Sequence, residues 1–235
     1  MKRILSISIA LILLIGTVCA CAQNDDSTGS GAAAPVTQPE ETANAEAPAE
    51  PQASETEGDK VLILYFSAAN TKDVDAVTSA TPLIDGVSSV EWLAEEIQRS
   101  VGGDMAAIIP SVDYPLVYND LADYAKEEAD SDARPAFEDL GVNPTSYDTV
   151  FLGYPIWWYR MPMILETFFD TYDFSGVTIV PFNTHEGSGN GGTYRMIQER
   201  EPNATVLDGF AVRGANSGKD STAQDLAKWL ENLEL

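Results

Sequence analysis

Five short apolar runs of strand length recur between residue 60 and the end of the chain. The first run, KVLILYFS at residues 60–67, is apolar at nearly every position, which is typical of a strand buried on both faces of a sheet. The other four runs cover residues 104–110, 148–155, 177–183 and 205–212. These runs predict a sheet with a cover on each face.

Amphipathic segments of helical length alternate with these runs. In residues 87–103 an apolar stripe recurs at helical spacing and consists of Val90, Leu93, Ala94, Ile97 and Val101. Ser88 and Glu91 predict a capping box at its start, and Gly102 predicts its end. Ser221 and Gln224 predict a second capping box in the last helical segment. The remaining helical segments are residues 116–130, 161–172, 193–200 and 219–235.

Strands that alternate with helices in this way favour an α/β protein with a doubly wound parallel sheet. Ligands of such sheets bind beyond the carboxyl ends of the strands, where the strand order reverses. The segments after the first, third and fourth runs are therefore expected to meet at one site.

The segment after the first run, residues 67–89, is long for a connection between a strand and a helix, and such loops are usually functional. It begins with the polar side chains of Ser67, Asn70 and Thr71, and Gly86 and Ser88 stand at its end. Hydroxyls and backbone N–H groups at a helix N-terminus can hold a phosphate. The alternative is an ordinary capped helix that follows a surface insertion.

Three aromatic residues, Trp157, Trp158 and Tyr159, follow the third run in GYPIWWYRMP at residues 153–162. Neighbouring side chains on an extended backbone point to opposite sides, so one core cannot hold all three. Together with Pro155 and Ile156 they can form a wall for a planar ring. The alternative is that the aromatic rings cover a sheet edge or a partner surface.

The segment after the fourth run, NTHEGSGNGG at residues 183–192, is rich in glycine. Glycines allow the backbone to approach a ligand closely and to direct N–H groups at it. Polar contacts can come from Thr184, His185, Glu186, Gly187, Ser188 and Gly189. A single histidine in a loop is more often solvated than catalytic.

The formal net charge of −24 makes nucleic acid an unfavourable partner. It is compatible with a solvated surface, with a basic partner, or with a role in tuning a redox centre. The two cysteines, Cys19 and Cys21, both lie near the N-terminus, so the domain beyond them has no disulfide and no cysteine nucleophile. With His185 as the one histidine, zinc sites with several His or Cys ligands are excluded.

Residues 1–20 have the pattern of an export signal, with Lys2 and Arg3 before an apolar run. Ala20 and Cys21 resemble a bacterial lipobox, whose cysteine carries the lipid. Residues 21–58 are rich in Ala, Pro and Glu and predict a disordered tether before a folded domain at residues 59–235. We therefore expect an exported protein held on the outer face of a bacterial cytoplasmic membrane by lipid alone. A plain signal peptide or an uncleaved anchor is the alternative.

A phosphate site, an aromatic wall and a glycine-rich loop at one edge fit a mononucleotide with a flat ring, and FMN fits best. The chain resembles a flavodoxin, more closely the short-chain type. The resemblance extends over residues 60–235 and is strongest in YDTVFLGYPIWWYRMP and VPFNTHEGSGNGG. It implies a three-layer sandwich with helices on both faces of a five-stranded sheet in the order 2-1-3-4-5, and non-covalent FMN.

The resemblance also implies a role for each loop. Ser67 and the loop after it, including Ala68, would hold the phosphate. The isoalloxazine would lie between Pro155–Trp158 and Thr184–Gly189. One departure concerns the phosphate loop, because NTKDVDAVTSATPLID interrupts a segment that is compact in flavodoxins. Either Asn70 and Thr71 or the far end at Gly86 and Ser88 would then serve the phosphate.

The sequence is compatible with three functions. The first is a membrane-tethered electron carrier with a redox partner protein. The second is an FMN enzyme that takes hydride from NAD(P)H and reduces a quinone-like acceptor, with His185 or Tyr159 as a proton donor. The third is a flavodoxin-fold binding module without flavin. The sequence identifies no residue that is clearly catalytic.

Overall fold

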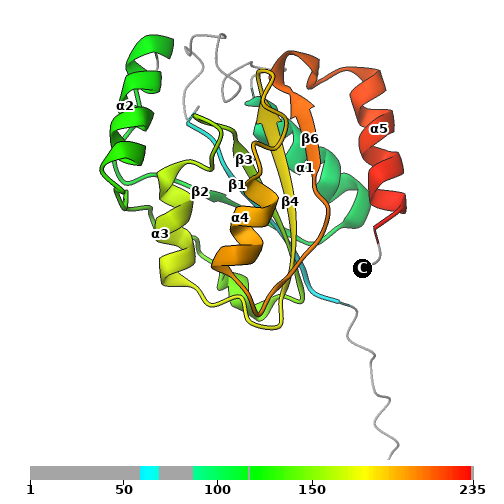
Figure 1. Cartoon of the computed structure of the whole chain (residues 1–235). Coiled ribbons are helices and arrows are strands. Elements are labelled where there is room, and N and C mark those ends of the chain that lie inside the picture. The colour runs from blue at the N-terminus through cyan, green and yellow to red at the C-terminus, as the bar shows by residue number, and fades with distance from the viewer. Residues whose placement is uncertain (1–58, 69–86, 116, 234–235) are drawn as a thin grey trace, which may run out of the picture. The chain divides into compact units, whose positions relative to one another are not determined.

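A parallel sheet forms the centre of the domain. The computed structural model describes residues 59–68, 87–115 and 117–233, which belong to the compact unit Ser54–Leu235 (Figure 1). The strands are β1 (Val61–Phe66), β2 (Asp104–Ile108), β3 (Thr149–Pro155), β4 (Thr178–His185), β5 (Thr205–Val206) and β6 (Phe210–Arg213). Their order is β2-β1-β3-β4-β5, and β6 also pairs with β4. The fold class and strand order expected from the sequence are confirmed.

The fifth expected strand is divided into β5 and β6, which both run parallel to β4. The interruption lies opposite Pro181 of β4, which has no N–H to donate to a neighbouring strand. Leu207 still donates its N–H to the Ile179 carbonyl. At Gly209 a Cβ atom would lie 2.2 Å from the Pro181 carbonyl oxygen, so the chain passes too close there for any side chain.

Helices cover both faces of the sheet and complete three layers (Figure 1). The helices are α1 (Ser89–Val101), α2 (Tyr118–Asp130), α3 (Met163–Thr171), α4 (Thr193–Arg200) and α5 (Asp220–Glu231). Leu64, Leu121 and Phe168 belong to one core cluster, which joins the sheet to α2, α3 and α4. Ile63 and Leu226 belong to the other, which joins it to α1 and α5. The apolar character of β1 on both faces follows from this arrangement.

The helix starts were predicted correctly in one case and wrongly in another. At α1 the Ser88 hydroxyl accepts the Glu91 N–H, the Glu91 carboxylate accepts the Ser88 N–H, and Gly102 caps the end. The second capping box is wrong, because α5 begins at Asp220 with Lys219 as its N-cap and without a side-chain cap. Ser221 therefore lies inside the first turn and cannot cap it.

Several expectations concern residues outside those described. They are the signal at residues 1–20, the tether at 21–58, the lipid site Cys21, and the phosphate candidates Asn70, Thr71 and Gly86. Within the described ranges no helix is both long and apolar enough to cross a membrane. The same residues contain no cluster of three or more His, Cys, Asp or Glu side chains that could hold a metal ion.

Candidate functional site

A tight turn, and not an extended segment, carries the aromatic residues after β3. Trp157 and Arg160 exchange two backbone hydrogen bonds of 3.0 Å each, which closes a two-residue turn over Trp158 and Tyr159. Both central residues have left-handed backbones, with φ of 50° and 60°. Asn and Gly usually fill such positions, and a bulky residue there costs about 1–2 kcal/mol. We call Trp157–Arg160 the tryptophan turn.

Trp157 points inward from this turn. Its side chain is 9% exposed and makes edge contacts with Phe66 at 5.6 Å and Tyr114 at 5.3 Å between ring centroids. Its indole nitrogen Nε1 is buried and finds no acceptor among the residues that the structure describes. A buried donor of this kind usually has a partner in the functional state, supplied by water or by a ligand.

Trp158 and Tyr159 remain at the surface, with 54% and 70% of their areas exposed. The Trp158 indole nitrogen donates a 2.9 Å hydrogen bond to the Ala122 carbonyl of α2. The ammonium group of Lys126 lies 6.0 Å from the centroid of the same indole ring. Trp158 therefore links the tryptophan turn to α2 through this hydrogen bond and this cation–π contact. The three rings are divided between core and surface, as expected. The tight turn separates them, and not the alternation of side chains along an extended strand.

The glycine-rich segment begins later than its sequence pattern indicates, because β4 extends to His185. We call Glu186–Gly192 the glycine loop. Gly187, Gly189, Gly191 and Gly192 all have positive φ, so the loop needs glycine at these positions. A Cβ atom on Gly191 would lie 3.0 Å from the Tyr159 carbonyl oxygen. The glycine loop and the tryptophan turn are thus in direct contact, as the topology rule predicts.

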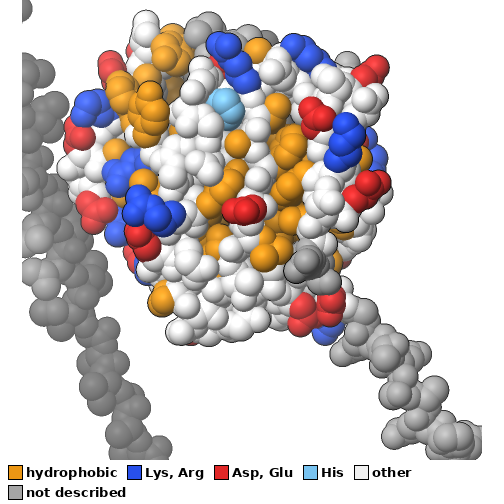
Figure 2. Space-filling view, turned by 45° about the vertical axis from the view of Figure 1, so that its right-hand side comes forward, with side chains coloured by type: hydrophobic (Ala, Val, Ile, Leu, Met, Phe, Trp, Pro, Cys, Tyr) orange, Lys and Arg blue, Asp and Glu red, His pale blue; other side chains and the backbone are white. Residues whose placement is uncertain are grey.

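Three side chains at the end of β4 and on β6 define the electrostatics of the glycine loop. The Gly187 N–H donates a 2.9 Å hydrogen bond to Nδ1 of His185. Burial lowers the pKa of His185, Arg213 lowers it further, and Glu186 opposes both. The Arg213 guanidinium donates a 3.0 Å hydrogen bond to the Glu186 carboxylate. Figure 2 shows His185, the one histidine of the chain, in pale blue at the surface of the domain.

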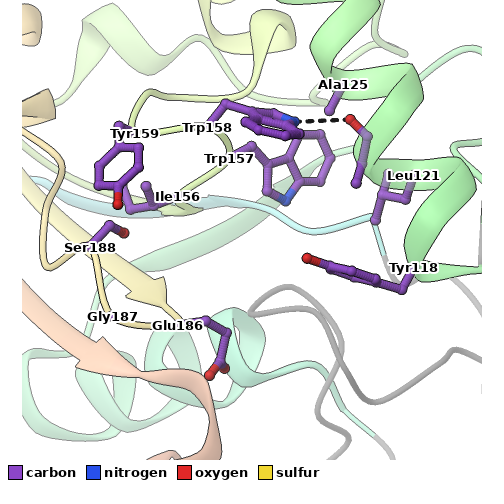
Figure 3. Close-up of a pocket in the computed structure, with 11 residues that line it drawn as sticks. Tyr118, Leu121, Ala125, Ile156, Trp157, Trp158, Tyr159, Glu186, Gly187 and Ser188 are labelled. Carbon is purple, nitrogen blue, oxygen red and sulfur yellow. Dashed lines mark hydrogen bonds between the residues drawn. The ribbon is translucent and has the colours of Figure 1, made fainter.

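A cavity of about 480 Å³ opens between these elements (Figure 3). It is lined by Tyr118, Leu121, Ala122, Ala125, Ile156, Trp157, Trp158, Tyr159, Glu186, Gly187 and Ser188. In Figure 3 the Trp157 indole nitrogen and the Tyr118 hydroxyl point toward the same space. The structure therefore brings together both the aromatic wall and the glycine loop that the sequence predicted.

Four lining residues on α2 were not predicted, namely Tyr118, Leu121, Ala122 and Ala125. A weak signal was present, because Leu121 and Ala125 are four residues apart on one helix face. The small side chain at Ala122 also leaves its carbonyl accessible to Trp158. Periodicity alone assigns such a face to the core, and its position beside the turn depends on tertiary packing.

Other predicted residues lie near the cavity without lining it. Pro155 and Thr184 end the paired segment of β3 and β4, and the Thr184 carbonyl accepts the Ile156 N–H at 2.8 Å. Nδ1 of His185 accepts the Gly187 N–H, and the Gly189 carbonyl accepts the side-chain amide of Asn183, so both residues help to fix the conformation of the glycine loop. Ser67 and Ala68 are buried after β1, and Ser88 is buried as the cap of α1. Their roles toward a phosphate stay predictions.

Glu128 lies on the buried face of α2, on the same helix as four residues that line the cavity. It is 8% exposed, and its carboxylate accepts a 3.1 Å hydrogen bond from the hydroxyl of Tyr114. Burial raises the pKa of Glu128 to about 7, although the bond from Tyr114 opposes that shift. Burial, together with the charge of Glu128, raises the pKa of Tyr114, which therefore stays a donor.

The fold and the site define a doubly wound α/β protein with an aromatic-walled cavity at the carboxyl edge of its sheet. The chain belongs to the flavodoxin family, whose model matches residues 60–233. No curated protein gives a significant match.

Three solved structures illustrate the similarity. A candidate flavoprotein from Bacteroides eggerthii DSM 20697 is 27% identical, with a TM-score of 0.59 over 76% of this chain and 99% of that one. A candidate flavoprotein from Bacteroides uniformis ATCC 8492 is 26% identical, with a TM-score of 0.58 over 75% of this chain and 100% of that one. A flavoprotein from Lactobacillus acidophilus NCFM in complex with FMN is 16% identical, with a TM-score of 0.49 over 68% and 96%.

Proposed function

We propose that residues 59–235 bind FMN non-covalently and that the protein transfers electrons. The observation that carries the proposal is the cavity between the tryptophan turn and the glycine loop, in a member of the flavodoxin family. A tricyclic ring needs flat apolar walls and a few donors for its carbonyl and nitrogen acceptors. Ile156 and Trp157 offer the wall, and Nε1 of Trp157 is a donor without an acceptor among the described residues.

The strain in the tryptophan turn supports the same proposal. Two aromatic residues occupy left-handed positions that Asn and Gly would fill at lower cost. Tyr159 makes little contact with the core, so stability does not explain its presence there. Strained residues cluster at ligand sites, where the surrounding structure holds them. We assign Tyr159 to the rim of the flavin site on this ground.

The flavin would supply the redox chemistry, and the protein would bind it, orient it and set its environment. Ile156 and Trp157 would line one side of the ring, and the glycine loop would contribute its backbone groups on the other. The net charge of −24 disfavours additional negative charge on a bound ring and would lower the reduction potential. The carboxylate of Glu186 adds little to this effect, because Arg213 neutralises it. Ser67 and Ala68 would begin the phosphate site.

The full chain, purified in detergent and supplied with FMN, tests the proposal. We expect about one FMN per chain on denaturation, with flavin absorption bands and with quenching of flavin fluorescence by the neighbouring indole. A colourless chain that leaves FMN fluorescence unchanged contradicts the proposal and favours a binding module without flavin. Steady oxidation of NAD(P)H in the presence of a quinone would instead favour the reductase.

We also propose that Cys21 carries a lipid that tethers the domain to the outer face of a bacterial cytoplasmic membrane. The support is the Ala20–Cys21 pair after an apolar run, followed by a polar segment that lies before the domain. Growth with a radiolabelled fatty acid should label the wild-type chain, and Cys21→Ala should remove the label. Cys19→Ala is the matched control and should keep it. A wild-type chain without label contradicts this part alone.

A further inference from the structure

A partly buried chain of hydrogen bonds links α4 and β4 to the glycine loop. The Tyr194 hydroxyl, at the start of α4, donates a 2.6 Å hydrogen bond to Oδ1 of Asn183. The side-chain amide of Asn183 then donates a 3.3 Å hydrogen bond to the Gly189 carbonyl. Asn183 is completely buried, and burial raises the pKa of Tyr194, so its hydroxyl remains a donor. The chain thus connects a helix, a strand and the loop.

A second chain reaches the next residue of the loop from β3. The hydroxyl of Tyr154 lies 2.8 Å from Oγ1 of Thr193, and both residues are completely buried. The Thr193 hydroxyl donates a 2.7 Å hydrogen bond to the Asn190 carbonyl, so Tyr154 is the donor in the first contact. Two successive carbonyl groups of the loop, those of Gly189 and Asn190, are therefore held from the interior.

These bonds determine how the loop presents its peptide groups. In a planar trans peptide the C=O and the next N–H point in opposite directions. Because the Gly189 carbonyl faces Asn183 inside the fold, the N–H of Asn190 is directed away from it. A segment with four glycines has many conformations of similar energy, so such external bonds select one of them.

We infer that Tyr194 and Asn183 are positioning residues, which set the conformation of the glycine loop and through it the affinity of the cavity for its flavin. This inference rests on the proposed function for the identity of the ligand. Tyr194 and Asn183 do not line the cavity, so they act through the loop and not by contact. Loss of the Tyr194 hydroxyl leaves Oδ1 of Asn183 without its donor and allows the amide to release Gly189.

The test compares Tyr194→Phe with Tyr147→Phe in the full chain. Tyr147 donates a 2.8 Å hydrogen bond to the Asp104 carboxylate at the opposite edge of the sheet, so it controls for the loss of a tyrosine hydroxyl as such. The dissociation constant for FMN is measured by fluorescence titration. Amide exchange of residues 189–192 is measured without FMN, and thermal unfolding reports whether each variant folds. Asn183→Asp is a second variant, because it places a carboxylate oxygen against the Gly189 carbonyl.

We expect Tyr194→Phe to weaken FMN binding about three- to tenfold, the usual range for one hydrogen bond, and to speed exchange in the loop. Asn183→Asp should act in the same direction, whereas Tyr147→Phe should change neither quantity. The inference is overturned if Tyr194→Phe leaves loop exchange unchanged, or if Tyr147→Phe weakens binding equally. If the wild-type chain binds no FMN, the proposed function fails, while the exchange measurement still decides the positioning role.

Discussion

The Tyr114 hydroxyl donates a 3.1 Å hydrogen bond to the Glu128 carboxylate, while the ring of Tyr114 makes an edge contact with the indole of Trp157. No Lys or Arg forms an ion pair with Glu128 among the described residues. The fold thus keeps a carboxyl group in an apolar environment, which favours its neutral form. This explains why the pKa of Glu128 rises to about 7.

The shift predicts a pH dependence of stability. Between about pH 4.5 and pH 7 the unfolded chain releases the Glu128 proton while the folded chain retains it, so the free energy of unfolding falls as pH rises. Glu128→Gln removes this titration and keeps an acceptor for Tyr114. It should be more stable than wild type by about 1–2 kcal/mol at pH 8, and equally stable near pH 4.5. Urea unfolding at both pH values measures the difference.

The control for this prediction is Glu127→Gln, which removes the same charge from the exposed neighbour of Glu128. It should leave the pH dependence as in the wild-type chain. If Glu128→Gln and wild type show parallel pH profiles, the carboxyl of Glu128 does not hold its proton in the folded state.

Tyr159→Gly separates stability from ligand binding. Glycine adopts a φ of 60° without strain, and Tyr159 is 70% exposed, so few contacts are lost. Relief of about 1–2 kcal/mol of strain is partly offset by the greater chain entropy that glycine loses on folding, about 0.5–1 kcal/mol. We therefore expect the free energy of unfolding to rise by about 0.5–1 kcal/mol, and FMN to bind less tightly because the rim of the cavity is gone. Asp132→Gly is the matched control, since Asp132 also has a left-handed backbone, with φ of 51°, but does not line the cavity. Equal effects of both variants on FMN binding would remove Tyr159 from the site.

The elements of the fold could be predicted because their sequence signals are local. The run VLILYF is apolar on both faces since α1 and α2 cover β1 from opposite sides, and the capping box of Ser88 and Glu91 needs only neighbouring residues. The division of the fifth strand had a signal in the neighbouring strand, because Pro181 of β4 lacks an N–H to donate across to it.

The site was predicted only in part, because its geometry depends on tertiary contacts. No propensity favours two aromatic residues in a left-handed turn, so an extended backbone was the natural expectation for Trp158 and Tyr159. The bond from Trp158 to Ala122 joins residues that are 36 positions apart, and it brings α2 to the cavity. A periodic pattern cannot reveal such a contact.

Gly153→Ala tests the packing beneath the site. A Cβ atom at Gly153 would lie 2.2 Å from the ring of Phe182, which is completely buried beside it on β4. The ring cannot move without disturbing the core, so we expect a loss of about 1–3 kcal/mol in the free energy of unfolding. Gly153 lies within β3 and is not among the glycines with positive φ, so the loss reports packing and not relief or cost of backbone strain. Unchanged stability of Gly153→Ala would contradict the packing seen between β3 and β4.

His185 provides the last prediction. Its Nδ1 accepts the Gly187 N–H only while the imidazole is neutral, and burial lowers its pKa in the folded chain. Below about pH 6.5 the unfolded chain takes up a proton that the folded chain resists, so stability falls as pH falls. Below the lowered pKa of the folded state the imidazole also protonates, releases Gly187 and weakens the loop side of the cavity. FMN affinity should therefore decline toward pH 5.

His185→Asn distinguishes this effect from titration of the FMN phosphate, which ionises in the same range. The asparagine oxygen can accept the Gly187 N–H at every pH, so the variant should bind FMN as tightly as wild type at pH 7.5 and more tightly at pH 5. The ratio of the two dissociation constants cancels the contribution of the ligand. His185→Leu lacks an acceptor and should bind weakly throughout. A ratio that stays constant from pH 7.5 to pH 5 would show that the imidazole does not control the loop, because a protonated Nδ1 cannot accept this bond.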